Sequence, residues 1–88
     1  MTPARVDRID PIAPVPPYQQ IAAILRRRIT SGTYPPDSRI PTESELVDEF
    51  EVARSTARRA VAVLRDEGLI YTVPNRGSYV TPPRGPAS

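Results

Sequence analysis

Apolar residues recur every three or four positions along the segment 18–31, which is the spacing of one face of a helix. Pro17 suits the first turn of such a helix, and Gly32 is a typical stop signal. We therefore expect a helix from Tyr18 to Ser31. Its core-facing stripe comprises Tyr18, Ile21, Ala22, Leu25 and Ile29.

A second helix is expected after a turn at 34–38 and a very short extended piece at Arg39-Ile40. The run Thr42-Glu43-Ser44-Glu45 has the capping-box pattern, in which Thr42 accepts a hydrogen bond from a first-turn amide and Glu45 reaches back. The apolar side of this helix consists of Leu46, Val47 and Phe50.

A tight connection at 51–54 leads to a third helix, expected from Arg54 to Glu67. Its core stripe is Ala57, Ala60, Val61 and Leu64. On a helical projection an adjacent sector carries Arg54, Arg58 and Arg65, and it is extended by Ser55, Arg59 and Ala62.

After Gly68 the pattern becomes that of a hairpin. The segments 69–73 and 78–81 are β-prone, and Pro74-Asn75-Arg76-Gly77 between them is a turn with an arginine at its tip. Asn75 and Gly77 both tolerate positive φ. The expected fold is therefore α+β, mainly α: a winged helix-turn-helix with three helices and a small antiparallel sheet.

Prolines mark the ends of the expected domain. Eight of the 12 prolines lie outside residues 18–80. We therefore expect a flexible, proline-rich arm at 1–17, a winged helix-turn-helix domain at 18–81 and a flexible tail at 82–88.

Composition excludes several classes of function. The chain has no cysteine and no histidine, so it lacks the usual side chains for a zinc site or a histidine-based catalytic centre. No Gly-rich phosphate loop or nucleophile elbow occurs either, so we expect no enzyme, no cofactor and no metal. No apolar run approaches the ~20 residues of a membrane span, and the first residues lack the core of a secretion signal, so a cytoplasmic protein is expected.

The distribution of charged residues along the chain indicates what kind of partner the protein binds. The net charge is only +2, but all 12 basic residues are arginine, whose planar fork matches phosphates and guanine edges. A codon bias that replaces lysine by arginine is the alternative explanation. The second helix is acidic, whereas the third has no acid between Arg54 and Arg65. This segregation favours a binding face for nucleic acid on the third helix, although an ordinary solvated face has the same composition. For the run Arg26-Arg27-Arg28 a solvated helix end and a phosphate contact both remain open.

Five motifs carry a resemblance to a known family. They are Pro17-Tyr18-Gln19-Gln20-Ile21, Ile40-Pro41-Thr42-Glu43-Ser44-Glu45-Leu46, Val52-Ala53-Arg54-Ser55-Thr56-Ala57-Arg58, Glu67-Gly68-Leu69-Ile70 and Arg76-Gly77-Ser78-Tyr79-Val80. In this order and spacing the chain resembles the DNA-binding domain of the GntR family of bacterial regulators over nearly all of residues 17–81.

The resemblance implies a sequence-specific regulator of transcription, most often a repressor, that binds a double-stranded operator. The operator is expected to be an inverted repeat, with a homodimer forming on the DNA. In such proteins the third helix enters the major groove, the start of the second helix approaches the backbone, and the wing enters or flanks the minor groove. The matching DNA-binding residues are Thr42, Ser44, Arg54, Ser55, Thr56, Arg58, Asn75, Arg76 and Gly77; the exposed face of the third helix adds Arg59.

Four departures from the family pattern accompany this resemblance. Ser44 stands where the family usually has arginine, Ala53 where it has serine or threonine, and Asn75 where it has glycine. The usual operator sequence is therefore not expected. The seven residues after Thr81 cannot form the effector-binding and dimerisation domain that normally follows, so the chain is expected to be either a stand-alone domain or a part of a longer regulator; a start methionine with a short tail favours the stand-alone domain. The alternative function is a winged-helix module that binds other proteins and not DNA.

Overall fold

The structure is a computed structural model that describes residues 8–82. Three helices are present: α1 at Pro17–Thr30, α2 at Glu43–Phe50 and α3 at Arg54–Asp66. They are followed by the antiparallel strands β1 at Ile70–Val73 and β2 at Gly77–Val80, which pair Ile70 with Val80 and Val73 with Gly77. The expected winged helix-turn-helix is thus confirmed, and its helices begin within one residue of their expected positions.

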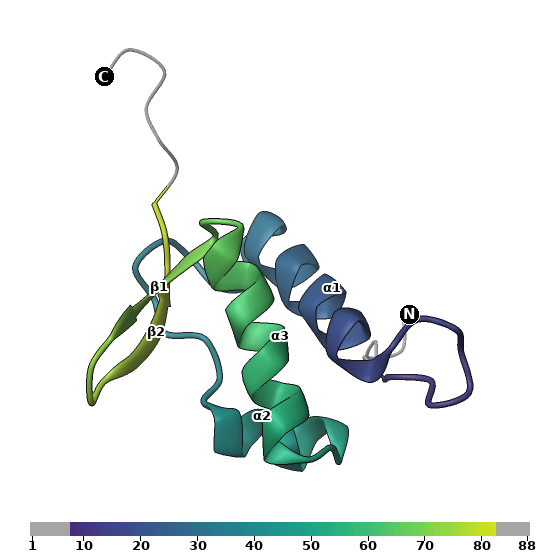
Figure 1. Ribbon diagram of the computed structural model, residues 1–88. Coiled ribbons are helices and arrows are strands. Elements are labelled where there is room, and N and C mark those ends of the chain that lie inside the picture. Colours follow the sequence, from purple (N-terminus) through teal and green to yellow (C-terminus); the bar gives the residue numbers. More distant parts are fainter. Residues whose placement is uncertain (1–7, 83–88) are drawn as a thin grey trace, which may run out of the picture.

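In Figure 1, α3 runs through the centre of the molecule, with α1 along one side and the β1–β2 hairpin on the other. The loop between α1 and α2 adds a third strand-like segment to this hairpin. Arg39 forms a bridge with Tyr79, Ile40 N donates to Ser78 O over 2.9 Å, and Val80 N donates to Ser38 O over 2.9 Å. The wing is therefore hydrogen-bonded to a part of the chain that precedes α2.

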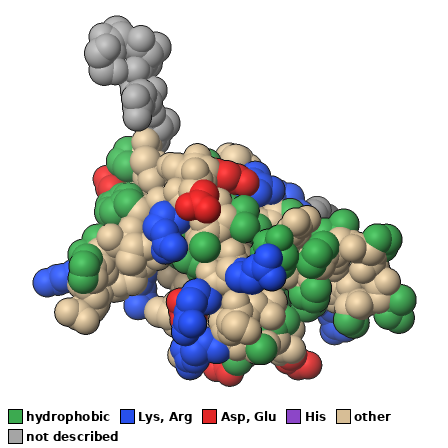
Figure 2. Space-filling view, in the orientation of Figure 1, with side chains coloured by type: hydrophobic (Ala, Val, Ile, Leu, Met, Phe, Trp, Pro, Cys, Tyr) green, Lys and Arg blue, Asp and Glu red, His purple; other side chains and the backbone are tan. Residues whose placement is uncertain are grey.

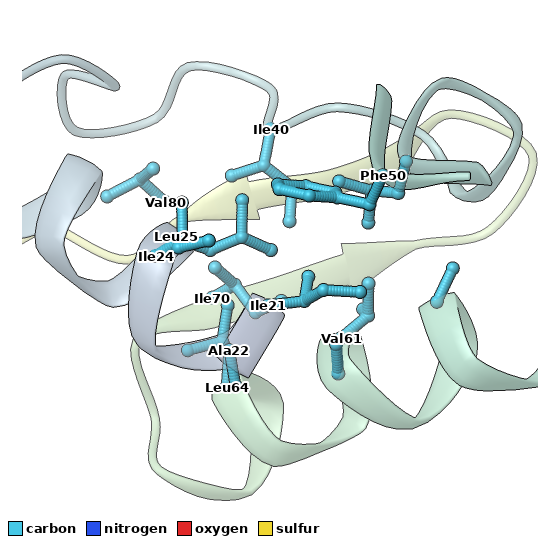
Figure 3. Close-up of a cluster of buried hydrophobic side chains, with 13 residues drawn as sticks. Ile21, Ala22, Ile24, Leu25, Ile40, Phe50, Val61, Leu64, Ile70 and Val80 are labelled. Atoms are coloured by element: carbon cyan, nitrogen blue, oxygen red, sulfur yellow. The ribbon is translucent and has the colours of Figure 1, made fainter. Parts of the chain in front are cut away.

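The core lies where the helices and the wing meet, and Figure 3 shows its side chains converging from all of them. All four residues of the α3 stripe are buried, as are Leu46 and Phe50 of α2. On α1 the stripe is wider than expected, because Ile24 is buried as well, while Tyr18 and Ile29 lie at the margin. Ile40, Ile70 and Val80 close the core from the wing, and among the described residues no polar or charged residue is buried.

Part of the segment assigned to the N-terminal arm is folded back on α1. Gln20 Nε2 donates to the carbonyl oxygens of Asp10 at 2.8 Å and Val15 at 2.7 Å, and Gln20 Oε1 accepts from Asp10 N at 2.6 Å. Ile9 packs against the core. Residues 11–15 form turns and bends, and one glutamine satisfies backbone groups that a proline-rich segment cannot pair by itself. Residues 1–7 and 83–88 lie outside the described part, so the expected flexibility of both ends stays a prediction.

Candidate nucleic-acid interface

The helix-turn-helix unit is built by local signals in the sequence. The capping box is present as expected: Thr42 Oγ1 accepts from Glu45 N at 3.1 Å, and Glu45 Oε1 accepts from Thr42 N at 2.7 Å. α2 ends at Phe50, and the next residue, Glu51, has a left-handed φ of 56° that turns the chain sharply into α3. Ala53 makes no side-chain cap, so the first amides of α3 keep no partner from that side chain. A side-chain hydrogen bond from Arg54 to Ser44 links the N-termini of α2 and α3.

An arginine cluster forms between these two N-termini. Arg54 Nη2 donates to Ser44 Oγ at 3.1 Å, and Arg54 Nη1 lies 3.8 Å from Glu43 Oε1. Arg58, one turn further along α3, places Nε 3.6 Å from Glu43 Oε2. The side chains of Arg54 and Arg58 are 56% and 63% exposed. Glu43 therefore holds two solvated arginines in loose ion pairs that another anion can replace.

A groove of about 520 Å³ connects this cluster to the wing. It is lined by the segment 39–41, by the start of α2, by one side of α3 and by the inner face of the hairpin. Among the described residues that line it, four are arginine and one is acidic. The polar lining consists of Arg39, Thr42, Glu43, Ser44, Arg54, Arg65, Thr72, Asn75, Arg76 and Ser78. Such a surface suits a polyanion of extended shape.

The tip of the wing depends on residues with positive φ. Asn75 has φ 65° and Gly77 has φ 117°. A Cβ added to Gly77 would lie 3.2 Å from Arg39 Cδ, so a larger residue would displace that side chain slightly, and the φ of 117° would strain any residue other than glycine. These two residues present Arg76, which is exposed, at the mouth of the groove.

The structure separates the expected DNA-binding residues into two groups. Thr42, Ser44, Arg54, Asn75, Arg76 and Gly77 line the groove, and Arg58 joins them through Glu43. Ser55 and Thr56 lie on the first turn of α3 and do not line the groove. Arg59 points to another part of the molecule, because its Cζ lies 4.0 Å from the ring centroid of Tyr18 on α1.

Figure 2 shows basic side chains over the face formed by α3 and the wing. Sequence reasoning left Arg39, Glu43, Arg65, Thr72 and Ser78 out of the site. The sequence places Arg65 on the same helical sector as Arg54 and Arg58, although it was not among the expected DNA-binding residues. Thr72 and Ser78 could have been paired from the hairpin register, which sets them opposite one another. Arg39 carried no such signal, since both α2 and α3 separate it in sequence from the wing residue that it contacts, Tyr79.

The basic run on α1 has acidic partners. Arg26 Nε donates to Glu67 Oε1 at 2.9 Å and its Nη2 lies 2.6 Å from Glu67 Oε2. Arg28 Nη2 lies 2.6 Å from Glu49 Oε2, and its Nη1 donates to the hydroxyl of Tyr34 at 2.6 Å. The hydrogen bond from Arg26 lowers the pKa of the Glu67 carboxyl and raises the pKa of the arginine. These arginines join helices, which favours a structural role over a phosphate contact.

The part of the chain that the structure describes contains neither a candidate metal site nor a candidate membrane-spanning helix. Within residues 8–82 no three metal-binding side chains lie together. None of the helices in that range is long and apolar enough to cross a membrane.

Comparison with known proteins gives a consistent result. The sequence model described as "Bacterial regulatory proteins, gntR family" matches residues 17–80. The histidine utilization repressor of Klebsiella aerogenes is 40% identical over 73 residues, which are 83% of this chain and 30% of that protein. The transcriptional repressor NagR of Bacillus subtilis is 38% identical over 72 residues, covering 82% of this chain and 30% of NagR. The chain thus spans about 30% of the length of these relatives.

Solved structures resemble the whole described fold. The DNA-binding domain of AraR in complex with operator ORE1 superposes with a TM-score of 0.79 at 33% identity, covering 88% of this chain and 100% of that one. YtrA from Sulfolobus acidocaldarius, a GntR-family transcription factor, gives a TM-score of 0.81 at 30% identity, over 91% of this chain and 84% of YtrA.

Proposed function

Because the chain belongs to the GntR family of bacterial regulatory proteins, we propose that it binds duplex DNA in a sequence-specific manner and regulates transcription. The two relatives named above are repressors, and repression is the activity proposed for this chain. Its site of action is the bacterial cytoplasm, where the DNA lies. The proposed target is an operator in the form of an inverted repeat, bound by two copies of the chain.

The observation that carries this proposal is the groove between the start of α2, α3 and the wing. Four arginines and several hydroxyl groups line it, and Glu43 is the acid among its described lining residues. A catalytic site or a protein-binding patch does not need such a set of arginines spread over the segment before α2, α3 and the wing. A DNA duplex does, because its phosphates flank the major groove on both sides.

Each element has a distinct proposed role. The N-terminal half of α3 enters the major groove, where Arg54 and Arg58 reach base edges and Ser55 and Thr56 reach phosphates. Thr42 and Ser44 bring the start of α2 to the backbone. The wing places Asn75, Arg76 and Gly77 at the minor groove or its phosphates. Arg59 stacks on Tyr18 in the free protein, and it contacts DNA only if that stacking is given up.

The proposal is tested by selecting bound sequences from a random duplex library with the 88-residue chain. We expect an enriched inverted repeat, together with retardation of a random duplex at low salt. A chain that retards no duplex at low salt would contradict the proposal and leave a protein-binding winged helix as the function. An enriched single half-site without symmetry would support DNA binding but contradict the paired mode.

A further inference from the structure

Arg65 occupies a distinct place in the groove. It lies on the C-terminal half of α3, eleven residues after Arg54 and seven after Arg58. Eleven residues are about three helical turns, so the three arginines form one stripe about 16 Å long. Unlike the other two, Arg65 has no carboxylate partner within residues 8–82. Its charge is therefore available to an external anion.

The wing fixes the direction of the Arg65 side chain. Arg65 Nη1 donates to Thr72 Oγ1 at 3.3 Å, and Thr72 Oγ1 is 3.1 Å from Ser78 Oγ on the opposite strand. Thr72 and Ser78 are a directly opposed pair of β1 and β2. A chain of hydrogen bonds thus runs from α3 across both strands of the wing, and it leaves the remaining donors of the guanidinium free to face the groove.

The position of Arg65 along α3 decides which part of DNA it meets. The N-terminal residues of a recognition helix contact base edges. Seven residues beyond Arg58 correspond to about 10 Å along the helix axis. In the proposed binding mode the N-terminal end of α3 lies deepest in the major groove, which is about 8.5 Å deep, so a residue about 10 Å further along α3 can reach the level of the backbone.

We propose that Arg65 is a DNA-backbone contact, held toward the phosphates by the hydroxyl groups of Thr72 and Ser78. This inference rests on the proposed function. It adds a residue outside the set expected from the sequence, and it gives α3 and the wing one shared phosphate-binding element. Arg65 is the binding residue of this element, and Thr72 and Ser78 are positioning residues.

The test measures binding of the 88-residue chain to a random-sequence duplex by fluorescence anisotropy over a series of salt concentrations. We expect Arg65→Gln to lower affinity about tenfold, the lower end of what a hydrogen bond to a charged group contributes. The slope of log K against log salt should fall by about 0.9, the value for one phosphate. Arg65→Lys should keep the wild-type slope. Arg26→Gln removes the same charge from α1, where Arg26 pairs with Glu67, and it should change neither the affinity nor the salt slope.

The positioning role has its own readout. Thr72→Val removes the hydroxyl without changing charge, so it should lower affinity severalfold while the salt slope stays at the wild-type value. In the Arg65→Gln background, Thr72→Val should have no further effect, because its action passes through the guanidinium. A thermal melt of each variant establishes that it is folded.

The outcomes separate this inference from the proposed function. A wild-type chain that binds no duplex would contradict the proposed function itself. A wild-type chain that binds, with an Arg65→Gln variant of unchanged affinity and slope, would overturn only the role of Arg65. A Thr72→Val effect of equal size in both backgrounds would overturn the positioning by the hydroxyl groups.

Discussion

At the scale of single residues, the arginines of this protein differ in how closely a carboxylate pairs with them. Arg26 and Arg28 are bound to carboxylates of other elements at 2.6 Å. Arg54 and Arg58 lie at 3.8 and 3.6 Å from Glu43, in contacts too long for strong hydrogen bonds. Surface pairs of this kind contribute at most about 1 kcal/mol. Arg54 and Arg58 can therefore exchange Glu43 for a DNA group with little loss of free energy.

Arg58→Ala should weaken binding to the selected operator more than binding to random DNA. The expected loss is about 1–3 kcal/mol on the operator, with relaxed preference at one base position, because a base contact is removed. Titration of both duplexes measures the difference. An equal loss on both would assign Arg58 to a phosphate.

At the scale of elements, the connection between α2 and α3 is made without glycine. Glu51 adopts φ 56° and ψ 51°, a conformation that costs an L-residue about 1–2 kcal/mol. Helices commonly end with glycine in this conformation. The sharp turn that sets α3 against α2 is therefore strained at one backbone position.

Replacing that residue should stabilise the fold. Glu51→Gly should raise the free energy of unfolding by about 0.5–1 kcal/mol, since the greater freedom of glycine in the unfolded chain offsets part of the relief. This corresponds to a rise of about 2–8 °C in melting temperature. Asp48→Gly, inside α2, is the control and should lower the melting temperature. A decrease for Glu51→Gly would mean that the side chain makes a stabilising contact.

The wing supplies a separate charged contact. Arg76→Ala should lower affinity on every duplex and reduce the salt slope by about 0.9, because one phosphate is no longer neutralised. The salt series described for Arg65 measures this change, with Arg26→Gln again as the control of equal charge. An unchanged slope would place the tip of the wing away from DNA.

At the scale of the whole molecule, local signals predicted the elements, and distant contacts escaped them. The capping box and the apolar stripes are patterns within one segment, so the bounds of α2 and α3 followed from them. The pairing of residues 38–40 with β2, the stacking of Arg59 on Tyr18 and the Arg26–Glu67 pair join segments far apart in sequence. Nothing in a single segment encodes such contacts. For the same reason, only the folded chain shows which arginines form ion pairs between helices and which line the groove.

The pair that joins α1 to the end of α3 should make stability depend on pH. The folded-state pKa of Glu67 is lowered from its ordinary value of 4.5 by the hydrogen bond from Arg26. Its contribution is therefore fully present above the unfolded pKa and is lost as pH falls through the folded pKa. The difference in unfolding free energy between wild type and Glu67→Gln, about 1 kcal/mol or less at pH 7, should vanish in acid. A constant difference for Glu67→Gln over the same pH range would refute the pair.

The chain should be a monomer in free solution and pair only on DNA. Among the described residues the large hydrophobic side chains left exposed are Ile12, Val15 and Tyr71. They are too few for a stable interface, which buries about 1,200–2,000 Å². On an inverted repeat, DNA raises the effective concentration of the second copy. Sedimentation at tens of micromolar decides the matter, and a dominant dimer there would reveal an interface outside this reasoning.

The attachment of the wing to residues 37–40 has a consequence for building hybrid regulators. β2 lies between β1 and a segment that precedes α2, and Gly77 fits closely against the side chain of Arg39. A chimaera that transplants only residues 70–80 from a relative would set foreign strands against an unmatched neighbour. The exchangeable unit is therefore discontinuous: it comprises the hairpin together with the loop between α1 and α2, and recombination that cuts between them breaks a matched surface.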